Sequence, residues 1–331
     1  MIKVGLLGLG FVGKIHLLQG YQKFDKSEIS LEACFDMAED NLALVDCPRK
    51  YTSLDKFFEN ECGKLDFIDI CLPTFLHAEV AIKAMKCGFH VLCEKPMALS
   101  IEDAEKMYNT SLETGKKLMI AHVLRFDEDY MKIKEYIDSK ILGKPIHAKY
   151  TTFRAGVPAG WFQNSRLSGG PIIDVHIHDA DILTWFFGMP KSVSTIAPGK
   201  SAAGCYDSFS TNMEYESLIV NVECDFSLPK ILHDNSRSLR LIFENGYVVK
   251  NEEIFVSVDR DGNIIDLKAQ RSAGYTSDAM YYNEIKYFAD SLKNSSPISK
   301  CLPYDSLLSA KLVQSEIYSA DKNGEKIYFN N

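Results

Sequence analysis

The middle of the chain carries an imidazole flanked by carboxylates. Asp174, His178 and Asp181 are spaced by four and three residues, so one continuous helix would place them along a single stripe. An imidazole beside a carboxylate is the usual means of taking a proton from a hydroxyl group near neutral pH. A buried histidine–aspartate pair that only holds a helix in place has the same spacing, so this segment by itself leaves both interpretations open.

The residues around this segment predict where its helix begins and ends. Gly169 and Gly170 precede Pro171, which suits the first position of a helix, and Gly188 with Pro190 suits the exit. A helix between Pro171 and Gly188 would therefore carry the candidate residues.

A metal site is the alternative that the same segment raises. His176-Ile177-His178 is similar to the HxH that lies at a strand end in zinc-dependent amidohydrolases. Such a site normally takes further His or Asp ligands from later strands. Only His233 follows His178 in this chain, so we expect no metal.

The lysine in Glu94-Lys95-Pro96 is a second candidate for chemistry. It follows a predicted strand at 89–93, and Pro96 restricts the backbone so that the ammonium would point into a crevice at the strand end. Glu94 would be its ion-pair partner or an orienting group for a cofactor. The alternative is that Lys95 is an ordinary surface lysine with no role in chemistry.

A polar, loop-like stretch just before Gly169 contains further candidates. Arg154, Trp161, Asn164 and Arg166 are of types that line substrate pockets, although exposed loop residues often have no such role. We take Arg154, Trp161 and Asn164 as candidate substrate residues.

The first forty residues predict a dinucleotide site. An apolar strand at 2–7 runs into Gly8-Leu9-Gly10-Phe11-Val12-Gly13, and a helical pattern follows. Glycines at these spacings allow a tight turn, the approach of a pyrophosphate and close packing of helix on strand. Asp36 ends the next strand, where an acid binds the ribose 2′-hydroxyl. Met37 supplies no cation for a 2′-phosphate, so NAD is favoured over NADP.

The elements around these motifs alternate between strand and helix in the first part of the chain. Strands are expected at 2–7, 30–35, 65–72, 89–93 and 117–121, with helices at 53–60, 74–86 and 100–114. This order predicts a doubly wound parallel sheet, in which ligands bind beyond the carboxyl ends of the strands. The glycine loop, Asp36, Pro73–His77 and Glu94–Pro96 all lie at such ends.

The second part of the chain has a different pattern. A helix at 127–141 is followed by alternating runs at 146–153, 192–197, 209–215, 218–226, 238–243, 247–250 and 254–258, and by helices near 278–293 and 303–322. This pattern predicts an α+β domain with a large, mostly antiparallel open sheet. We therefore expect a Rossmann domain at 1–122, and at 123–331 a domain that binds substrate and forms oligomers.

The overall composition excludes several classes of protein. The 331 residues carry a net charge of −8 without a basic run, which argues against a nucleic-acid or anionic-membrane surface. No apolar stretch approaches the roughly 20 residues of a membrane span, and no signal peptide is expected. Nine cysteines without metal-like spacing, several of them inside apolar strand patterns, indicate buried thiols in a reducing cytoplasm.

These motifs together resemble the glucose–fructose oxidoreductase / inositol dehydrogenase (Gfo/Idh/MocA) family along nearly the whole chain. The similar segments are Gly8–Gly13, Cys71-Leu72-Pro73-Thr74 with His77, Glu94-Lys95-Pro96, and Gly169-Gly170 with Asp174 and His178. Pro171 departs from many members, which have a third glycine or another small residue there. The resemblance implies an active site between a Rossmann domain and an α+β domain, with Lys95, Asp174 and His178 as catalytic residues. The expected cofactor-binding residues are Gly8, Gly10, Phe11, Val12, Gly13, Asp36, Cys71, Leu72, Pro73, His77, Glu94 and Lys95.

The expected function is NAD-dependent oxidation of a secondary hydroxyl in a sugar, cyclitol or related polyol. His178 would be the general base, Lys95 would stabilise the reacting oxygen, and Asp174 would orient the imidazole or bind a neighbouring hydroxyl. Two alternatives remain: an NAD-dependent glycosidase that uses transient oxidation, and a non-enzymatic NAD- or sugar-sensing protein. The apolar positions of the C-terminal strands need a partner, so we expect a homodimer or homotetramer.

Overall fold

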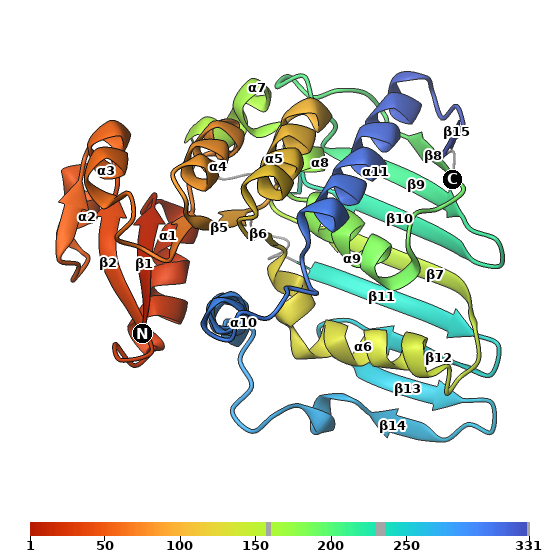
Figure 1. Ribbon diagram of the computed structural model, residues 1–331. Coiled ribbons are helices and arrows are strands. Elements are labelled where there is room, and N and C mark those ends of the chain that lie inside the picture. The colour runs from red at the N-terminus through yellow and green to blue at the C-terminus, as the bar shows by residue number, and fades with distance from the viewer. Residues whose placement is uncertain (157–159, 229–235, 330–331) are drawn as a thin grey trace. The chain divides into compact units, whose positions relative to one another are not determined.

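The computed structural model describes residues 1–156, 160–228 and 236–329 and divides the chain into two compact units. Residues 1–127 with 276–307 form the first unit, and residues 128–275 with 308–331 form the second. Each unit has its own sheet, which can be followed by colour along the chain in Figure 1.

The first unit is built on a parallel sheet, as expected, and the sheet has six strands, one more than the sequence analysis gave. In spatial order these are β3 (Arg49–Tyr51), β2 (Ile29–Phe35), β1 (Ile2–Leu7), β4 (Phe67–Ile70), β5 (His90–Glu94) and β6 (Leu118–Ala121). Every residue of β4 and β6 is buried, which is typical of a sheet covered on both faces. Strand β3 is too short to give an apolar pattern and was not expected.

Helices cover both faces of this sheet. On one side Phe57, Met85 and Met107 belong to a core formed with α3 (Leu54–Glu61), α4 (His77–Lys86) and α5 (Ile101–Thr114). On the other side lies the helical segment after the glycine loop. It begins as α1 (Phe11–Ile15), continues as a π-turn (His16–Gly20) and ends in a 3₁₀ turn (Tyr21–Lys23).

The helix α10 (Ala279–Lys293) also belongs to the first unit, although the sequence analysis placed all residues after 122 in the second domain. Its buried Ile285 and Phe288 belong to the core on the α1 side, where the ring of Phe288 lies 5.2 Å from that of Phe67. A β-carbon on Gly20 would lie within the Ile285 side chain, so helix and π-turn are in close contact. The amphipathic pattern of α10 predicted a helix but not which sheet it covers.

The second unit is built on a nine-stranded, mostly antiparallel sheet, again as expected. Its order is β14 (Ile264–Asp266), β13 (Phe255–Asp259), β12 (Gly246–Lys250), β11 (Ser236–Phe243), β7 (Pro145–Phe153), β10 (Ile219–Asp225), β9 (Ser208–Glu214), β8 (Ser192–Ile196) and β15 (Ile327–Tyr328). Among the described strands of this second sheet, only the pairing of β7 with β10 is parallel. The short strands β14 and β15 were not expected.

Helices α6 (Glu128–Ser139) and α9 (Ile177–Phe187) lie over one face of this sheet (Figure 1). The last long helix, α11 (Pro303–Asp321), begins in the first unit and continues into the second. No helix in the described part of the chain is long and apolar enough to cross a membrane.

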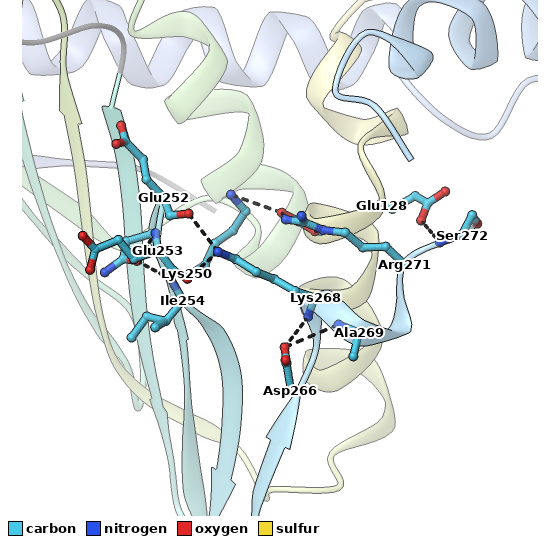
Figure 2. Close-up of polar contacts among 12 residues, drawn as sticks. Glu128, Lys250, Glu252, Glu253, Ile254, Asp266, Lys268, Ala269, Arg271 and Ser272 are labelled. Carbon is cyan, nitrogen blue, oxygen red and sulfur yellow. Dashed lines mark hydrogen bonds and ion pairs between the residues drawn. The ribbon is translucent and has the colours of Figure 1, made fainter. Parts of the chain in front are cut away.

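A group of ion pairs holds the start of α6 to the segment after β14 (Figure 2). Arg271 binds Asp129 with two hydrogen bonds of 2.7 and 2.6 Å, and the Lys250 ammonium lies 3.3 Å from the same carboxylate. The main-chain N–H of Ser272 donates to Glu128 at 2.8 Å. Bidentate, half-buried pairs of this kind fix a segment that has little regular structure.

Candidate functional site

The glycine loop after β1 has the geometry of a phosphate-binding turn. Gly8 has a φ of +94°, and a β-carbon there would lie 2.6 Å from the carbonyl oxygen of Cys71. A β-carbon on Gly13 would collide with the carbonyl oxygen of Gly8, so the helix packs directly on the loop. A β-carbon on Gly10, in contrast, would meet no atom within 4 Å, so a ligand can approach the backbone there.

Asp36 lies beside this loop at the carboxyl end of β2. Its carboxylate accepts hydrogen bonds from the main-chain N–H of Leu9 at 2.7 Å and of Ala38 at 2.8 Å, and from the Asn41 amide at 3.1 Å. The carboxylate is therefore fixed next to the glycine loop, and it stays half-exposed to solvent.

His77 connects the segments that follow β4 and β5. One ring nitrogen lies 2.8 Å from the carbonyl oxygen of Leu72 and the other 2.8 Å from that of Pro96. Burial lowers the pKa of this imidazole. The ring holds two loops together at the carboxyl edge of the sheet, and its direct contact with a cofactor, like that of Cys71, Leu72 and Pro73, stays a prediction.

Glu94 ends β5 and is almost fully buried. One carboxylate oxygen lies 3.0 Å from His16 Nε2, and the other accepts the main-chain N–H of Lys95 at 3.0 Å. The carboxylate thus orients the backbone at Lys95, a role the sequence analysis had not considered. His16 was not singled out there either, although a histidine between the apolar residues Ile15 and Leu17 of the helical segment could have indicated it.

In the second unit, the segment that carries Asp174 and His178 is not one helix. Residues Pro171–Asp174 form α8, Ile177–Phe187 form α9, and the chain breaks at Val175 and His176. The amides of Val175 and His176 both donate to the carbonyl oxygen of Pro171, at 2.8 and 3.0 Å. The condition for a single stripe, one continuous helix, is therefore not met: Asp174 ends one helix, and His178 and Asp181 lie on the next.

The entry and the exit of this segment are as expected. Gly170 has a φ of +73°, and a β-carbon there would lie 2.5 Å from that of Cys205, so glycine is required. Pro171 is the first residue of α8, and Gly188 ends α9 with a φ of +75°. Asp174 and Asp181 are buried and His178 is half-buried.

A buried ionic cluster around His176 explains the break. The His176 ring lies between two carboxylates, with Nδ1 3.2 Å from Asp179 and Nε2 3.0 Å from Glu316 on α11. Arg237 on β11 binds the other oxygen of Asp179 at 3.0 Å. Burial alone would lower the pKa of His176, but Glu316 and the hydrogen bond to Asp179 raise it well above its usual value. A buried imidazole without hydrogen-bond partners would be costly, so the chain gives up a continuous helix here and the ring keeps both carboxylate contacts.

The cluster does not require a metal ion. His176, Asp179 and Cys224 offer ligand atoms within 4.8 Å of one another. Yet the two carboxylates are already balanced by the imidazolium and by the Arg237 guanidinium, and burial raises the pKa of the Cys224 thiol to about 11. The HxH interpretation gains no support from this arrangement, and His233 lies outside the described residues.

Of the candidate substrate residues, Trp161 lies in a short 3₁₀ helix (Gly160–Gln163), Asn164 lies just before α7 (Ser165–Ser168), and Arg154 lies in irregular structure just after β7. Asn164 caps α7, with its side chain accepting the Arg166 N–H at 3.1 Å, and Trp161 stacks on Phe162 with ring centroids 4.0 Å apart. The main-chain N–H of Arg154 donates to Asp225 at 2.8 Å. A cavity of about 250 Å³ adjoins this segment and is lined by residues that include Phe162, Gln163, Ser165, Pro171 and Cys205.

The structure thus groups the expected residues within each unit. The glycine loop, Asp36, His77, Glu94 and Lys95 lie at the carboxyl ends of neighbouring strands in the first unit. Asp174 and His178 lie on successive helices of the second unit.

Comparison with known proteins gives matches in both units. The family described as "Oxidoreductase family, NAD-binding Rossmann fold" matches residues 2–122, and the "GFO/IDH/MocA C-terminal domain" matches residues 130–249. The chain is 29% identical over 192 residues to the myo-inositol 2-dehydrogenase of Thermotoga maritima. These residues cover 56% of this chain and 55% of the T. maritima protein. It is 34% identical over 167 residues to the D-glucoside 3-dehydrogenase of Escherichia coli. That match covers 48% of this chain and 46% of the E. coli protein.

Among solved structures, levoglucosan dehydrogenase in complex with NADH is similar with a TM-score of 0.88. The similarity covers 100% of this chain and 99% of the other, at 18% identity, so it concerns the fold alone. The chain spans about half the length of the two curated relatives above.

Proposed function

This chain belongs to the GFO/IDH/MocA family of oxidoreductases, and from that premise we propose that it is an NAD-dependent dehydrogenase of sugars, cyclitols or related polyols. The observation that carries the proposal is the glycine loop, open at Gly10 and bordered by the Asp36 carboxylate. It is supported by the names of the two relatives, which act on an inositol and a glucoside.

The proposed residue roles follow from the chemistry of alcohol oxidation. His178 takes the hydroxyl proton as general base and returns it in the reverse reaction. Lys95 donates a hydrogen bond to the same oxygen and stabilises its developing negative charge. Asp174 orients the imidazole or binds a neighbouring hydroxyl. The nicotinamide, when bound, accepts the hydride from the carbon atom.

The first unit would hold the cofactor through the residues at its carboxyl edge. The main chain at Gly8, Gly10, Phe11, Val12 and Gly13 fits a pyrophosphate. Asp36 would accept hydrogen bonds from the ribose diol, and its charge would repel a 2′-phosphate. We therefore propose a preference for NAD over NADP.

The experiment that tests this function is a polyol panel with purified protein. It contains myo-inositol, scyllo-inositol, glucose, a methyl glucoside and levoglucosan, each with NAD or NADP, and reduced cofactor is followed by its absorbance. Stoichiometric NADH from at least one compound is the expected result. Cleavage of the glucoside without net NADH would instead identify the glycosidase. Tight NAD binding without turnover of any compound would favour a sensor.

We also propose that the protein is a homodimer or homotetramer that associates through the sheet of the second unit. Its face away from α9 carries a row of cross-strand neighbours that runs Ile219, His147, Ile242 and Tyr247. Ile219 is 52% exposed and Tyr247 is 41% exposed, so this face is partly apolar.

A further inference from the structure

A chain of buried hydrogen bonds runs beneath the cofactor loop and ends at Lys95. The hydroxyl of Tyr21 donates to Asp69 at 2.7 Å, and the same carboxylate oxygen lies 2.8 Å from His16 Nδ1. His16 Nε2 lies 3.0 Å from one oxygen of Glu94, whose other oxygen accepts the Lys95 N–H at 3.0 Å. All of these contacts lie within the first unit.

The surroundings of His16 include two features that by themselves disfavour folding. Asp69 and Glu94 come from the neighbouring parallel strands β4 and β5, and both carboxylates are buried. His16 begins the π-turn that interrupts the cofactor helix, and its ring is 0% exposed, with the Tyr281 ring of α10 5.8 Å away. Two buried carboxylates and a π-turn are each unfavourable, and such features are commonly retained where they have a function.

The geometry of this group suits a protonated imidazole. Each ring nitrogen faces a carboxylate oxygen, and only the imidazolium has two N–H groups with which to donate to two ionised carboxylates. Burial alone would lower the pKa of His16, but the neighbouring Cys71, and after it the Asp69 carboxylate with its hydrogen bond, raise it well above the usual value. The nearby Cys71 thiol stays neutral, because burial raises its pKa far above the physiological range.

We propose that His16 is a positioning residue, which fixes the Glu94 carboxylate so that Glu94 holds the backbone of the catalytic Lys95 in place. This inference rests on the proposed function, because it takes Lys95 as catalytic. Without the imidazolium, two buried carboxylates would lack their cation, and Glu94 would lose the hydrogen bond that fixes its carboxylate. The hydrogen bond that orients Lys95 would then be lost, and a small displacement of a catalytic group can lower a rate about 100-fold.

A double-mutant cycle tests this inference, with single-turnover hydride transfer to NAD from the fastest compound of the panel as readout. His16→Leu should slow the step about 10- to 100-fold in the wild-type background. In the Lys95→Ala background, His16→Leu should lower the rate of hydride transfer by less than about 3-fold, because the lysine side chain that His16 helps to position is already absent. In either background, His16→Leu should change the affinity for NADH, followed by its fluorescence, by less than about 3-fold, because the glycine loop and Asp36, which would hold the phosphates and the adenine ribose, keep their own contacts.

Control variants separate positioning from damage to the fold. His16→Gln keeps one amide donor but no charge. If His16→Leu fails to fold, this milder change should still give a folded protein, and its hydride transfer should still be slowed. His90→Gln is the matched control. His90 begins the strand that Glu94 ends and accepts the Lys117 N–H at 2.9 Å. This variant should lower the melting temperature without slowing hydride transfer.

The possible failures can be told apart. An equal loss of rate from His16→Leu or His16→Gln with and without Lys95 would overturn the positioning role but leave the proposed function intact. An unchanged rate in Lys95→Ala would overturn the role of Lys95 itself, and this inference with it.

Discussion

At the scale of single residues, the candidate site combines groups of two kinds. Gly8, Gly13 and Gly170 are required by backbone geometry, since a side chain on any of them would meet neighbouring atoms. Asp36 and Glu94 are held by hydrogen bonds to main-chain N–H groups, which fixes their carboxylates before any ligand binds. Such preorganisation lowers the cost of binding and of reaching the transition state.

The first prediction at this scale concerns His178. If it is the general base, His178→Asn should slow hydride transfer about 10²- to 10⁴-fold, the usual worth of a general base. The oxidation rate of the wild type should also fall at low pH, where a protonated imidazole cannot accept a proton. Single-turnover rates and melting temperatures of both proteins check this. A stable and fully active His178→Asn enzyme would show that another residue is the base.

The second prediction concerns Asp36 and the choice of cofactor. Asp36→Ser removes the charge that repels a 2′-phosphate, so the preference for NAD should fall by about 10-fold or more, equal to at least 1.4 kcal/mol. Calorimetric titration with NAD and NADP measures both affinities. Asp40→Ser, which removes an exposed carboxylate nearby in the chain, is the control and should leave the preference unchanged. Equal affinity of the wild type for the two cofactors would refute the assignment.

At the scale of elements, the break between α8 and α9 is the feature that links site and core. His178 is the second residue of α9, and two residues earlier His176 anchors the turn to Asp179 and to Glu316 of α11. The helix that carries the proposed base is therefore held by a buried ion cluster below it. Removing one partner from such a cluster leaves an uncompensated buried charge and costs about 3–5 kcal/mol.

The third prediction follows from the raised pKa of His176. A group whose pKa is higher in the folded than in the unfolded state stabilises the fold fully below the unfolded value, about 6.5 for histidine. That stabilisation is lost as the pH rises through the folded pKa. The wild-type melting temperature should therefore fall as the pH rises above about 6.5 and through the raised pKa of folded His176. His176→Gln should melt lower, with a shallower pH dependence.

His90→Gln is the control, because burial lowers the pKa of His90 to about 4, so this histidine adds little pH dependence above about pH 6.5. It should leave the slope of melting temperature against pH above about pH 6.5 near that of the wild type. An equally steep pH dependence in His176→Gln would mean that His176 is not the group that titrates.

At the scale of the whole molecule, the two units differ in how their sheets are covered. The parallel sheet has apolar cores on both faces, whereas the nine-stranded sheet carries helices on one face. On its other face polar pairs such as Thr151 with Ser238 and Lys149 with Glu223 surround the apolar row through Ile242. Large open sheets of this kind commonly bind a second copy of the chain.

The fourth prediction is that this face forms the subunit interface. Light scattering at micromolar concentration should give the mass of a dimer or tetramer, and Ile242→Glu should shift it toward the monomer. Leu112→Glu changes an exposed leucine on α5 of the first unit and should leave the mass unchanged. A wild-type protein that is monomeric under these conditions would contradict the prediction.

Most elements of both sheets could be predicted from the sequence, because their signals are local. Unbroken apolar runs indicated the parallel strands, alternation indicated the antiparallel ones, and the glycine loop with Asp36 indicated the cofactor site. Pro171 and Gly188 marked the start of α8 and the end of α9 correctly, because their backbone preferences act within a few residues.

Only the tertiary structure decided the features that depend on distant partners. The break at His176 requires Glu316, which lies 140 residues later in the chain, and the orientation of Glu94 requires His16, which lies 78 residues earlier. The packing of α10 on the first sheet depends on Ile285 and Phe288 meeting Gly20 and Phe67. Spacing along the chain shows which side chains a helix or strand presents, but burial and charge pairing across the fold determine which of them meet.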